Sequence, residues 1–355
     1  MKALTYDDIQ LVPQFSTVQS RSQVNLNTRL SKNYTMDLPF IASPMDTICE
    51  FEMAKSMLCA GGTGVLHRFM SIDQQAKMCS EVNSFLYHEL EGWNLSNKPT
   101  VAAVGVGDEG FERAKKLVDS RARVVLIDVA HGHHENVKYL LKRLVSYRED
   151  LVKVDPTKNF DIIAGNIATY EGAKDLIDWG ADGLRVGIGG GSLCTTRIET
   201  GHGIPNITAL EAVVRAAQVY DIPVMADGGI RSAGDVAKAI AVGADSVMLG
   251  SLLSGTEETP GKVIEKRGTL FKRYRGSASL ETKTEHGQRQ NNVEGESTVV
   301  PFKGGVTNVI IKLVDGLRSA LSYTGAHNLE EYKSKSKYVA VTNAGLREAN
   351  PHLIY

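Results

Sequence analysis

Eight short apolar segments recur along the chain, separated by amphipathic or polar stretches. They cover residues 38–45, 62–67, 100–105, 124–129, 161–166, 183–188, 223–228 and 246–251. Near-continuous runs rich in Val, Ile, Leu and Ala are typical of parallel strands that are buried on both faces. Eight such βα units in series predict an α/β fold. A closed (β/α)8 barrel, the TIM barrel, is favoured over an open sheet.

Helix signals lie between these strands. One apolar stripe follows the fourth strand and consists of Val137, Leu140, Leu141, Leu144 and Val145. Thr208 and Glu211 form a predicted capping box for the helix before the seventh strand, and Ser232 predicts the start of the next helix. Residues 179–183 and 242–246 nearly repeat one another, which supports a repeated unit of helix, stop and strand.

The composition indicates a globular cytoplasmic enzyme. The chain has 355 residues, enough to bury a large core in a single barrel domain spanning 1–355. Lys plus Arg number 40 against 41 Asp plus Glu, so no general attraction to nucleic acid or a membrane is expected. The four cysteines lack metal-ligand spacing and suit a reducing compartment. Cys49, Cys59 and Cys79 are interpreted as packing residues.

Two segments do not fit the repeat. Residues 86–99 form a polar connector that is too short for an inserted regulatory domain. Residues 276–305 are mostly polar and lack periodicity, so they predict either a mobile flap after strand eight or a solvated surface loop. The amphipathic residues 306–323 that follow are expected to close the barrel wall.

Polar residues cluster where the predicted strands end. They are Ser43, His67, Asp128, Asn166, Asp227 and Ser251. In a barrel of this kind the active site is built at the C-terminal ends of the strands. Core packing does not explain so many polar residues at one end, so this end is the predicted active site.

Residues 187–196 carry the strongest chemical signal. Their glycines let backbone amides approach an anion, and Ser192 adds a hydroxyl donor. Cys194 stands where a nucleophile would attack a bound substrate. Thr196 could position water or protonate a leaving group if a carboxylate lay close. Taken alone, the segment fits a buried, inert cysteine equally well.

Two further glycine turns end the seventh and eighth strands, where phosphate sites are common in this fold. They contain Asp227, Gly228 and Gly229, and Gly250 with Ser251. An acid would repel a phosphate, so Asp227 is expected to accept hydrogen bonds from ribose hydroxyls. Together with Cys194, these turns predict a phosphorylated nucleoside whose base is presented to a thiol.

Two other motifs carry weaker signals. Residues 105–110 match the glycine spacing of a dinucleotide fingerprint, but Asp108 and Glu109 would face the pyrophosphate, so an ordinary βα turn is favoured. His131, His133 and His134 could bind a metal, although no carboxylate or cysteine stands at matching spacing. Metal binding there is the minor interpretation.

Several segments taken together resemble the IMP dehydrogenase and GMP reductase family over essentially the whole chain. The matching segments are residues 6–13, 43–47, 187–197, 226–230, 274–276 and 293–295. The resemblance implies a covalent intermediate in which the thiolate of Cys194 is bonded to C2 of a purine nucleotide. It also implies that Thr196 and Glu294 handle the leaving or entering group.

The resemblance implies roles for other positions. Substrate-binding residues would be Ser43, Met45, Ser192, Asp227, Gly228, Gly229, Gly250, Ser251, Tyr274, Gly276 and Ser277. Cofactor-binding residues would be Asp128, Ala130, Asn166 and Gly187, and the carbonyls of Gly189, Gly191 and Cys194 would be candidate ligands of K⁺. The expected partners are a purine nucleotide, NADPH or NAD, and further copies of the chain in a homotetramer.

The two branches of this family share the intermediate and differ in its fate. The dehydrogenase oxidises IMP with NAD and hydrolyses the adduct to XMP. The reductase expels ammonia from GMP and reduces the adduct to IMP with NADPH. Dehydrogenases carry an Arg-Tyr pair that activates water in a long flap, whereas here Arg289 is followed by Gln290. Val129 and residues 67–69 and 276–279 also resemble reductases.

Other segments favour the dehydrogenase branch, namely residues 71–75, 226–231, 342–348 and 351–352. The missing pair concerns chemistry rather than scaffold, so a GMP reductase is predicted, with an IMP dehydrogenase lacking the regulatory insert as the alternative. A nucleotide-binding regulatory protein without turnover is disfavoured by the intact Cys194, Thr196 and Glu294. A phosphosugar isomerase or aldolase on the same barrel would need a lysine or glutamate base at a strand end. The predicted strand ends show no such lysine, so this class ranks last.

Overall fold

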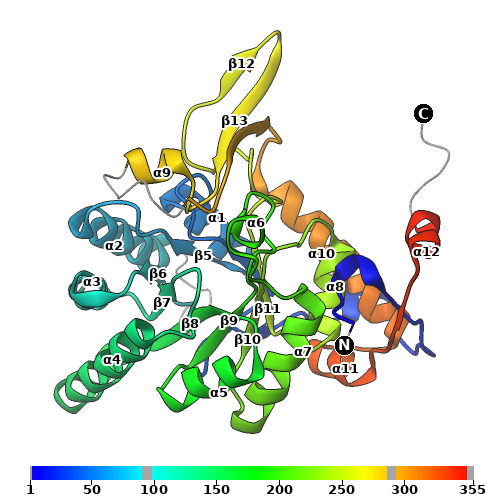
Figure 1. Cartoon of the computed structure of the whole chain (residues 1–355), viewed down its shortest axis with the longest axis horizontal. Coiled ribbons are helices and arrows are strands. Elements are labelled where there is room, and N and C mark those ends of the chain that lie inside the picture. The colour runs from blue at the N-terminus through cyan, green and yellow to red at the C-terminus, as the bar shows by residue number, and fades with distance from the viewer. Residues whose placement is uncertain (1, 90–97, 286–292, 350–355) are drawn as a thin grey trace.

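The computed structural model describes residues 2–89, 98–285 and 293–349, and a closed barrel of eight parallel strands lies at its centre (Figure 1). The barrel strands are β4 Phe40–Ala42, β5 Thr63–Leu66, β6 Val101–Val104, β7 Val124–Asp128, β8 Asp161–Ile167, β9 Gly183–Val186, β10 Val224–Asp227 and β11 Ser246–Leu249. Each neighbour pairs in chain order, and β11 pairs with β4 to close the ring. Every predicted apolar segment coincides with one of these strands to within a few residues, so the (β/α)8 prediction is confirmed.

Helices surround the barrel (Figure 1). They are α1 Phe51–Ala60, α2 Ile72–Glu89, α3 Gly107–Asp119, α4 Glu135–Val154, α5 Tyr170–Asp178, α7 Asn206–Ala217, α8 Ala233–Ala241 and α10 Val306–Thr324. Four of the five residues in the predicted stripe of α4 are buried, and the fifth, Val145, is partly buried. Helix α10 packs against both α8 and α1, so it closes the outer ring as expected.

The core has two layers because successive side chains of a strand point to opposite faces. On β7, Val124 and Leu126 belong to the cluster inside the barrel, whereas Val125 and Ile127 pack against the helices. The inner cluster also contains Leu30 and Met36, from the hairpin β2 Thr28–Arg29 and β3 Thr35–Met36. This hairpin covers the end of the barrel where the strands begin, which leaves the opposite end for a site.

The helix starts agree with the sequence in one case and not in the other. Ser232 caps α8 by accepting a hydrogen bond from the amide of Asp235, as predicted. The capping box at Thr208 is wrong, because α7 already begins at Asn206 after Pro205. The Thr208 hydroxyl instead accepts from the amide of Leu4, 2.8 Å away. A long-range contact has therefore taken the group that would have capped the helix.

The two irregular segments are more ordered than the sequence indicates. Helix α2 continues to Glu89, so the connector is shorter than predicted, and residues 90–97 lie outside the described part of the chain. Within 276–305, the structure has helix α9 Leu280–Glu285 and strand β14 Ser297–Pro301. Strand β14 pairs with β13 Thr269–Arg275, which in turn pairs with β12 Ile264–Lys266. The segment is therefore not irregular throughout, which corrects that part of the prediction, and the mobile flap itself stays a prediction. Residues 286–292 are not described.

Shorter elements lie around the barrel ends. They are the 3-10 turn η1 Tyr6–Asp8, strands β1 Ile9–Leu11 and β15 Tyr338–Ala340, and helices α6 Thr196–Thr200, α11 Leu329–Lys335 and α12 Asn343–Glu348. Strands β1 and β15 pair in antiparallel fashion, which joins the two terminal parts of the chain. Residues 105–110 form the turn from β6 into α3 of the closed barrel, so the ordinary βα turn is confirmed. Among the described helices, none is long and apolar enough to cross a membrane.

Candidate active site

One pocket at the C-terminal ends of the strands collects all the residues to which the sequence analysis gave a catalytic, substrate, cofactor or cation role. It has a volume of about 320 Å³, within the range of about 300–1,000 Å³ that is usual for small-molecule sites. The lining includes Cys194, Thr196 and Glu294; Ser43, Met45, Ser192, Asp227, Gly228, Gly229, Gly250, Ser251, Tyr274, Gly276 and Ser277; and Asp128, Ala130, Asn166, Gly187, Gly189 and Gly191. Their common location agrees with the prediction, and the role of each residue stays a prediction.

The cysteine loop leaves β9 through a glycine that no other residue could replace. Gly187 has φ 140°, and a side chain there would overlap the carbonyl oxygen of Asp227 on β10. The loop then turns back, with the amide of Cys194 donating to the carbonyl of Gly191 at 3.1 Å. Helix α6 begins two residues after the thiol, at Thr196. Close packing against β10 therefore fixes where the loop starts.

Cys194 is the first member of a chain of three polar side chains. Its Sγ lies 3.1 Å from Thr196 Oγ1, and Thr196 Oγ1 donates to Glu294 Oε2 at 2.6 Å. The backbone holds the same segments together, because Cys194 forms a β-bridge with Gly295 and the Thr195 amide donates to the carbonyl of Glu294 at 3.1 Å. A thiol, a hydroxyl and a carboxylate in series can move a proton to or from a group bound at the sulfur.

The far wall of the pocket offers hydroxyls and backbone amides. Ser192 Oγ and Tyr274 OH lie 3.1 Å apart, and burial raises the pKa of Tyr274, so its phenol stays protonated. Gly250 faces Tyr274, since a side chain there would meet the phenol oxygen at 3.4 Å. Neutral donors of this kind, on glycine turns, suit an anion such as a phosphate.

A buried arginine that the sequence analysis missed links the two acidic strand ends. Arg185 on β9 binds Asp128 through Nη1 at 2.6 Å, and it binds Asp227 through Nε at 3.0 Å and Nη2 at 2.9 Å. Burial alone would lower the pKa of Arg185, but Asp227 and Asp128 outweigh it and raise that pKa. A charge within the apolar run 183–188 was the available signal, because unpaired charges are almost never buried.

Asp227 is also held by an amide. Asn166 Nδ2 donates to Asp227 Oδ2 and to the carbonyl of Gly187, both at 2.7 Å. Among the described side chains, Asn166 and Arg185 contact Asp227, and both bind its Oδ2 atom. Asp227 also lines the pocket, so its carboxylate is placed to accept from hydroxyl groups of a ligand.

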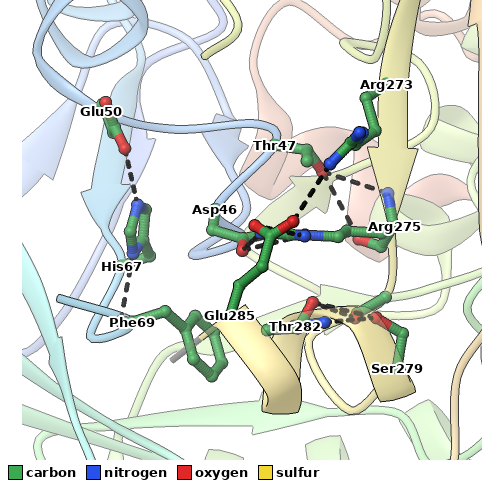
Figure 2. A network of polar contacts seen from close by, with 11 residues as sticks. Asp46, Thr47, Glu50, His67, Phe69, Arg273, Arg275, Ser279, Thr282 and Glu285 are labelled. Carbon is green, nitrogen blue, oxygen red and sulfur yellow. Dashed lines mark hydrogen bonds and ion pairs between the residues drawn. The ribbon is translucent and has the colours of Figure 1, made fainter. Parts of the chain in front are cut away.

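The turn after β5 adds two pocket residues that the sequence analysis did not assign, Arg68 and Phe69. His67, one of the predicted polar strand ends, lies behind them rather than in the lining. Its Nδ1 accepts from the Phe69 amide at 3.1 Å and its Nε2 faces Glu50 at 3.0 Å (Figure 2). Arg68 Nε lies 3.5 Å from Asp128 Oδ2. His67 thus acts on the site by shaping this turn.

Charged side chains fasten the wall formed by β13 and α9. The buried Arg275 binds Asp46 through Nε at 3.0 Å, next to the pocket residue Met45. From α9, Glu285 reaches Arg275 Nη1 at 2.8 Å and Arg273 Nη1 at 3.1 Å (Figure 2). The backbone of Arg275 also exchanges hydrogen bonds with the Thr47 hydroxyl. These contacts tie residues 276–285 to the loop after β4.

Cysteine and histidine residues elsewhere have simpler surroundings. Cys49 and Cys79 are buried, and burial raises the pKa of Cys79 to about 12, so they are packing residues as predicted. Cys59 is exposed, so the packing interpretation is wrong for that residue. The described residues contain no group of three or more His, Cys, Asp or Glu side chains arranged to hold a metal, and His133 pairs with Asp175.

Comparisons with known proteins point to one family. A model of the IMP dehydrogenase / GMP reductase domain matches residues 3–352. An inosine-5'-monophosphate dehydrogenase from Cryptosporidium parvum is 39% identical over 99% of this chain and 95% of that protein. A GMP reductase from Leishmania major is 34% identical over 99% of this chain and 97% of that protein.

A solved structure agrees with this relationship. It is a Cys→Ala variant of GMP reductase from Trypanosoma brucei in complex with guanosine 5'-monophosphate, and it is 32% identical to this chain. The superposition has a TM-score of 0.91 and covers 100% of this chain and 98% of the other. Sequence, fold and pocket therefore agree, and this chain belongs to the IMP dehydrogenase / GMP reductase family.

Proposed function

We propose that this protein is a GMP reductase, which converts GMP to IMP and ammonia with NADPH as the reductant. The family acts on purine nucleotides by oxidation or reduction. The observation that carries the proposal is the series Cys194 Sγ, Thr196 Oγ1 and Glu294 Oε2, with separations of 3.1 and 2.6 Å. This series places a nucleophile beside a proton donor, as the expulsion of an amine requires.

The first step is the attack of Cys194 on C2 of the bound purine. The Sγ–C2 bond forms, the exocyclic C2–N bond breaks, and the amine leaves as ammonia with a proton supplied through Thr196 and Glu294. NADPH supplies a hydride to C2 when it is bound. The C2–Sγ bond then breaks, which releases IMP and restores the Cys194 thiolate.

The nucleotide is proposed to lie across the glycine turns. Its phosphate meets Ser192, Gly229, Gly250, Ser251 and Tyr274, where donors dominate the lining. Its ribose hydroxyls donate to Asp227, whose Oδ2 is already held by Asn166 and Arg185. The base is thereby presented to Cys194, with Ser43, Met45, Gly276 and Ser277 around it.

The nicotinamide side of the dinucleotide is proposed to lie against Asp128, Ala130, Asn166 and Gly187, which line the same pocket. Two polar side chains of the lining, Asp128 and Arg68, suit the dinucleotide in this position. Asp128 is fixed by Arg185 and can accept from ribose hydroxyls, and Arg68, whose Nε pairs with Asp128 at 3.5 Å, adds a positive charge beside it. We also propose that K⁺ binds the carbonyls of Gly189, Gly191 and Cys194. We further propose that the protein forms a homotetramer.

The branch is chosen on a difference in sequence, because the family contains relatives of both names. The water-activating Arg-Tyr pair typical of dehydrogenases is replaced by Arg289 and Gln290, which lie outside the described residues. Val129 lines the cofactor side, where dehydrogenases tend to carry Ser or Thr. The second candidate is an IMP dehydrogenase, favoured by the 39% identity to the Cryptosporidium enzyme.

A steady-state assay with both nucleotides and both dinucleotides tests the proposal. NADPH oxidation that depends on GMP and releases ammonia is expected. Reduction of NAD that depends on IMP, with formation of XMP, would transfer the assignment to the dehydrogenase.

Cys194→Ala should reduce kcat by about 10³-fold or more in either branch, because the covalent step is lost. GMP binding, measured by calorimetry, should survive. Cys59→Ala is the matched control, since Cys59 is an exposed thiol on α1. Substantial turnover by the Cys194→Ala variant would refute the covalent mechanism.

A further inference from the structure

Two glycine loops that line the pocket touch one another. One contains Gly190 and Gly191, in front of Cys194, and the other contains Gly228, after β10. A side chain at Gly228 would meet the Gly190 carbonyl carbon and the Gly191 nitrogen at 3.0 Å. The two loops therefore lie so close that no side chain fits between them at Gly228.

Asn206 lies behind this contact and touches both loops. It is the first residue of α7, and only 4% of its surface is exposed. Its Nδ2 donates to the carbonyl of Gly228 at 2.5 Å. A side chain at Gly190 would come within 2.6 Å of Asn206 Oδ1, and one at Gly229 within 3.0 Å of Nδ2. The asparagine amide thus occupies the space that these three glycines leave.

The N-terminal turn η1 packs against Gly229 and Asn206. The ring of Tyr6, which is 1% exposed, lies against Gly229 beside Asn206. Lys238 Nζ donates to the Tyr6 carbonyl at 2.8 Å, and Arg231 pairs with Asp7. Because α7, α8 and η1 are joined in this way, Asn206 has little freedom to move.

One buried polar atom in this cluster lacks a hydrogen-bond partner. Asn206 Oδ1 is buried and has no hydrogen-bond partner among the described atoms. Burial raises the pKa of the Tyr6 hydroxyl, which interacts with the Asn206 side chain. A buried acceptor without a partner is costly, so such a group is usually kept for a reason other than stability. Asn206 does not line the pocket, so it does not touch the ligand there.

We propose that Asn206 is a positioning residue that holds the two glycine loops in register for a phosphate. The inference rests on the proposed function, in which these loops bind the phosphate of the nucleotide. Backbone amides bind an anion tightly only when they are already ordered, because ordering a loop on binding costs conformational entropy. Asn206 thereby sets the preference for a nucleoside monophosphate over the nucleoside, without touching the base or the reacting atoms.

The test compares nucleotide with nucleoside in two variants. Asn206→Leu keeps a branched side chain and removes the hydrogen bond, and Asn206→Ala removes both. The affinities for IMP and GMP, from calorimetry, are expected to fall about tenfold, which is the loss of about one buried hydrogen bond. The inhibition constants of inosine and guanosine, from competition, should stay within about twofold, as should kcat at saturating nucleotide.

Asn33→Leu is the matched control, because Asn33 makes a side-chain hydrogen bond of 2.7 Å to Asp161, which begins β8 at the opposite end of the barrel. It should leave nucleotide affinity unchanged. An equal loss for nucleotide and nucleoside, or no loss in Asn206→Leu, would overturn the inference. If the wild-type protein binds IMP tightly but does not reduce GMP, the proposed function fails while this test can still be completed.

Discussion

The candidate site brings together side chains that lie far apart in the sequence. Thr196 stands two residues after Cys194, but Glu294 comes from 98 residues further along. The thiol and the threonine could be recognised together because they share one loop. Glu294 was named through the resemblance, and the β-bridge between Cys194 and Gly295 supplies the physical link.

Thr196→Val tests this link at the scale of one residue. The variant keeps the volume but breaks the path from Sγ to Glu294, so kcat should fall by about 10²-fold or more. GMP affinity should change little, which calorimetry would check. Thr157→Val, at the opposite end of the barrel, is the control. An undiminished kcat in Thr196→Val would show that the hydroxyl moves no proton.

Arg185 shows what residue-level reasoning could not find. It stands within an apolar strand, and its partners Asp128 and Asp227 belong to two other strands. The sequence places all three at or near strand ends, but only the barrel places β7 and β10 close enough for one guanidinium to reach both. Pairing across a closed barrel depends on strand register, which local periodicity does not report.

At the scale of elements, the strands were more predictable than the helix ends. Each barrel strand is buried on both faces, so its composition alone marks it. Helix starts depend on which groups remain free to cap them, and Thr208 is engaged by Leu4 instead. The segment 276–305 appeared irregular because β14 is short and half exposed, and its partner β13 lies outside that segment.

A buried ion pair fastens α4 to the barrel and gives an element-scale prediction. Arg148 on α4 binds Asp182 before β9, and Asp182 also accepts from the Ile162 amide of β8 at 2.9 Å. Arg148→Gln leaves a buried carboxylate without its cation, so the free energy of unfolding should fall by about 3 kcal/mol.

Chemical denaturation measures this change. Lys153→Ala is the control on the same helix, because its pair with Asp150 is 72% exposed on both sides. That variant should lose no more than about 0.5 kcal/mol. Equal losses in the two variants would show that the buried pair contributes nothing particular.

At the scale of the whole molecule, the outer helix ring closes with one particularly close approach between helices. Helix α10 lies against α8 through Gly316, where an added Cβ would overlap the Cβ of Ala233. A glycine inside a helix ordinarily costs about 1 kcal/mol relative to alanine. Its presence here is explained by the packing of the two helices.

Gly316→Ala should therefore destabilise the protein by about 1–3 kcal/mol despite the better helix propensity, because the helices must separate. Adding Ala233→Gly should recover most of that loss, and Ala233→Gly alone should cost about 1 kcal/mol. Thermal or chemical unfolding of the two single variants and the double variant measures the coupling. Additive effects would show that α8 and α10 do not meet at this point.

The number and order of the βα units, the end of the barrel with the candidate site, and the loop with the thiol could all be predicted from the amino-acid sequence. These are local properties, since apolar runs and glycine turns follow from neighbouring residues. Only the tertiary structure decided that Arg185 joins two acids, that Asn206 fills the space between glycine loops, and that β13 and α9 form an ordered wall. Those contacts form when the barrel closes and brings distant residues together, and the separation of these residues along the chain does not predict that they meet.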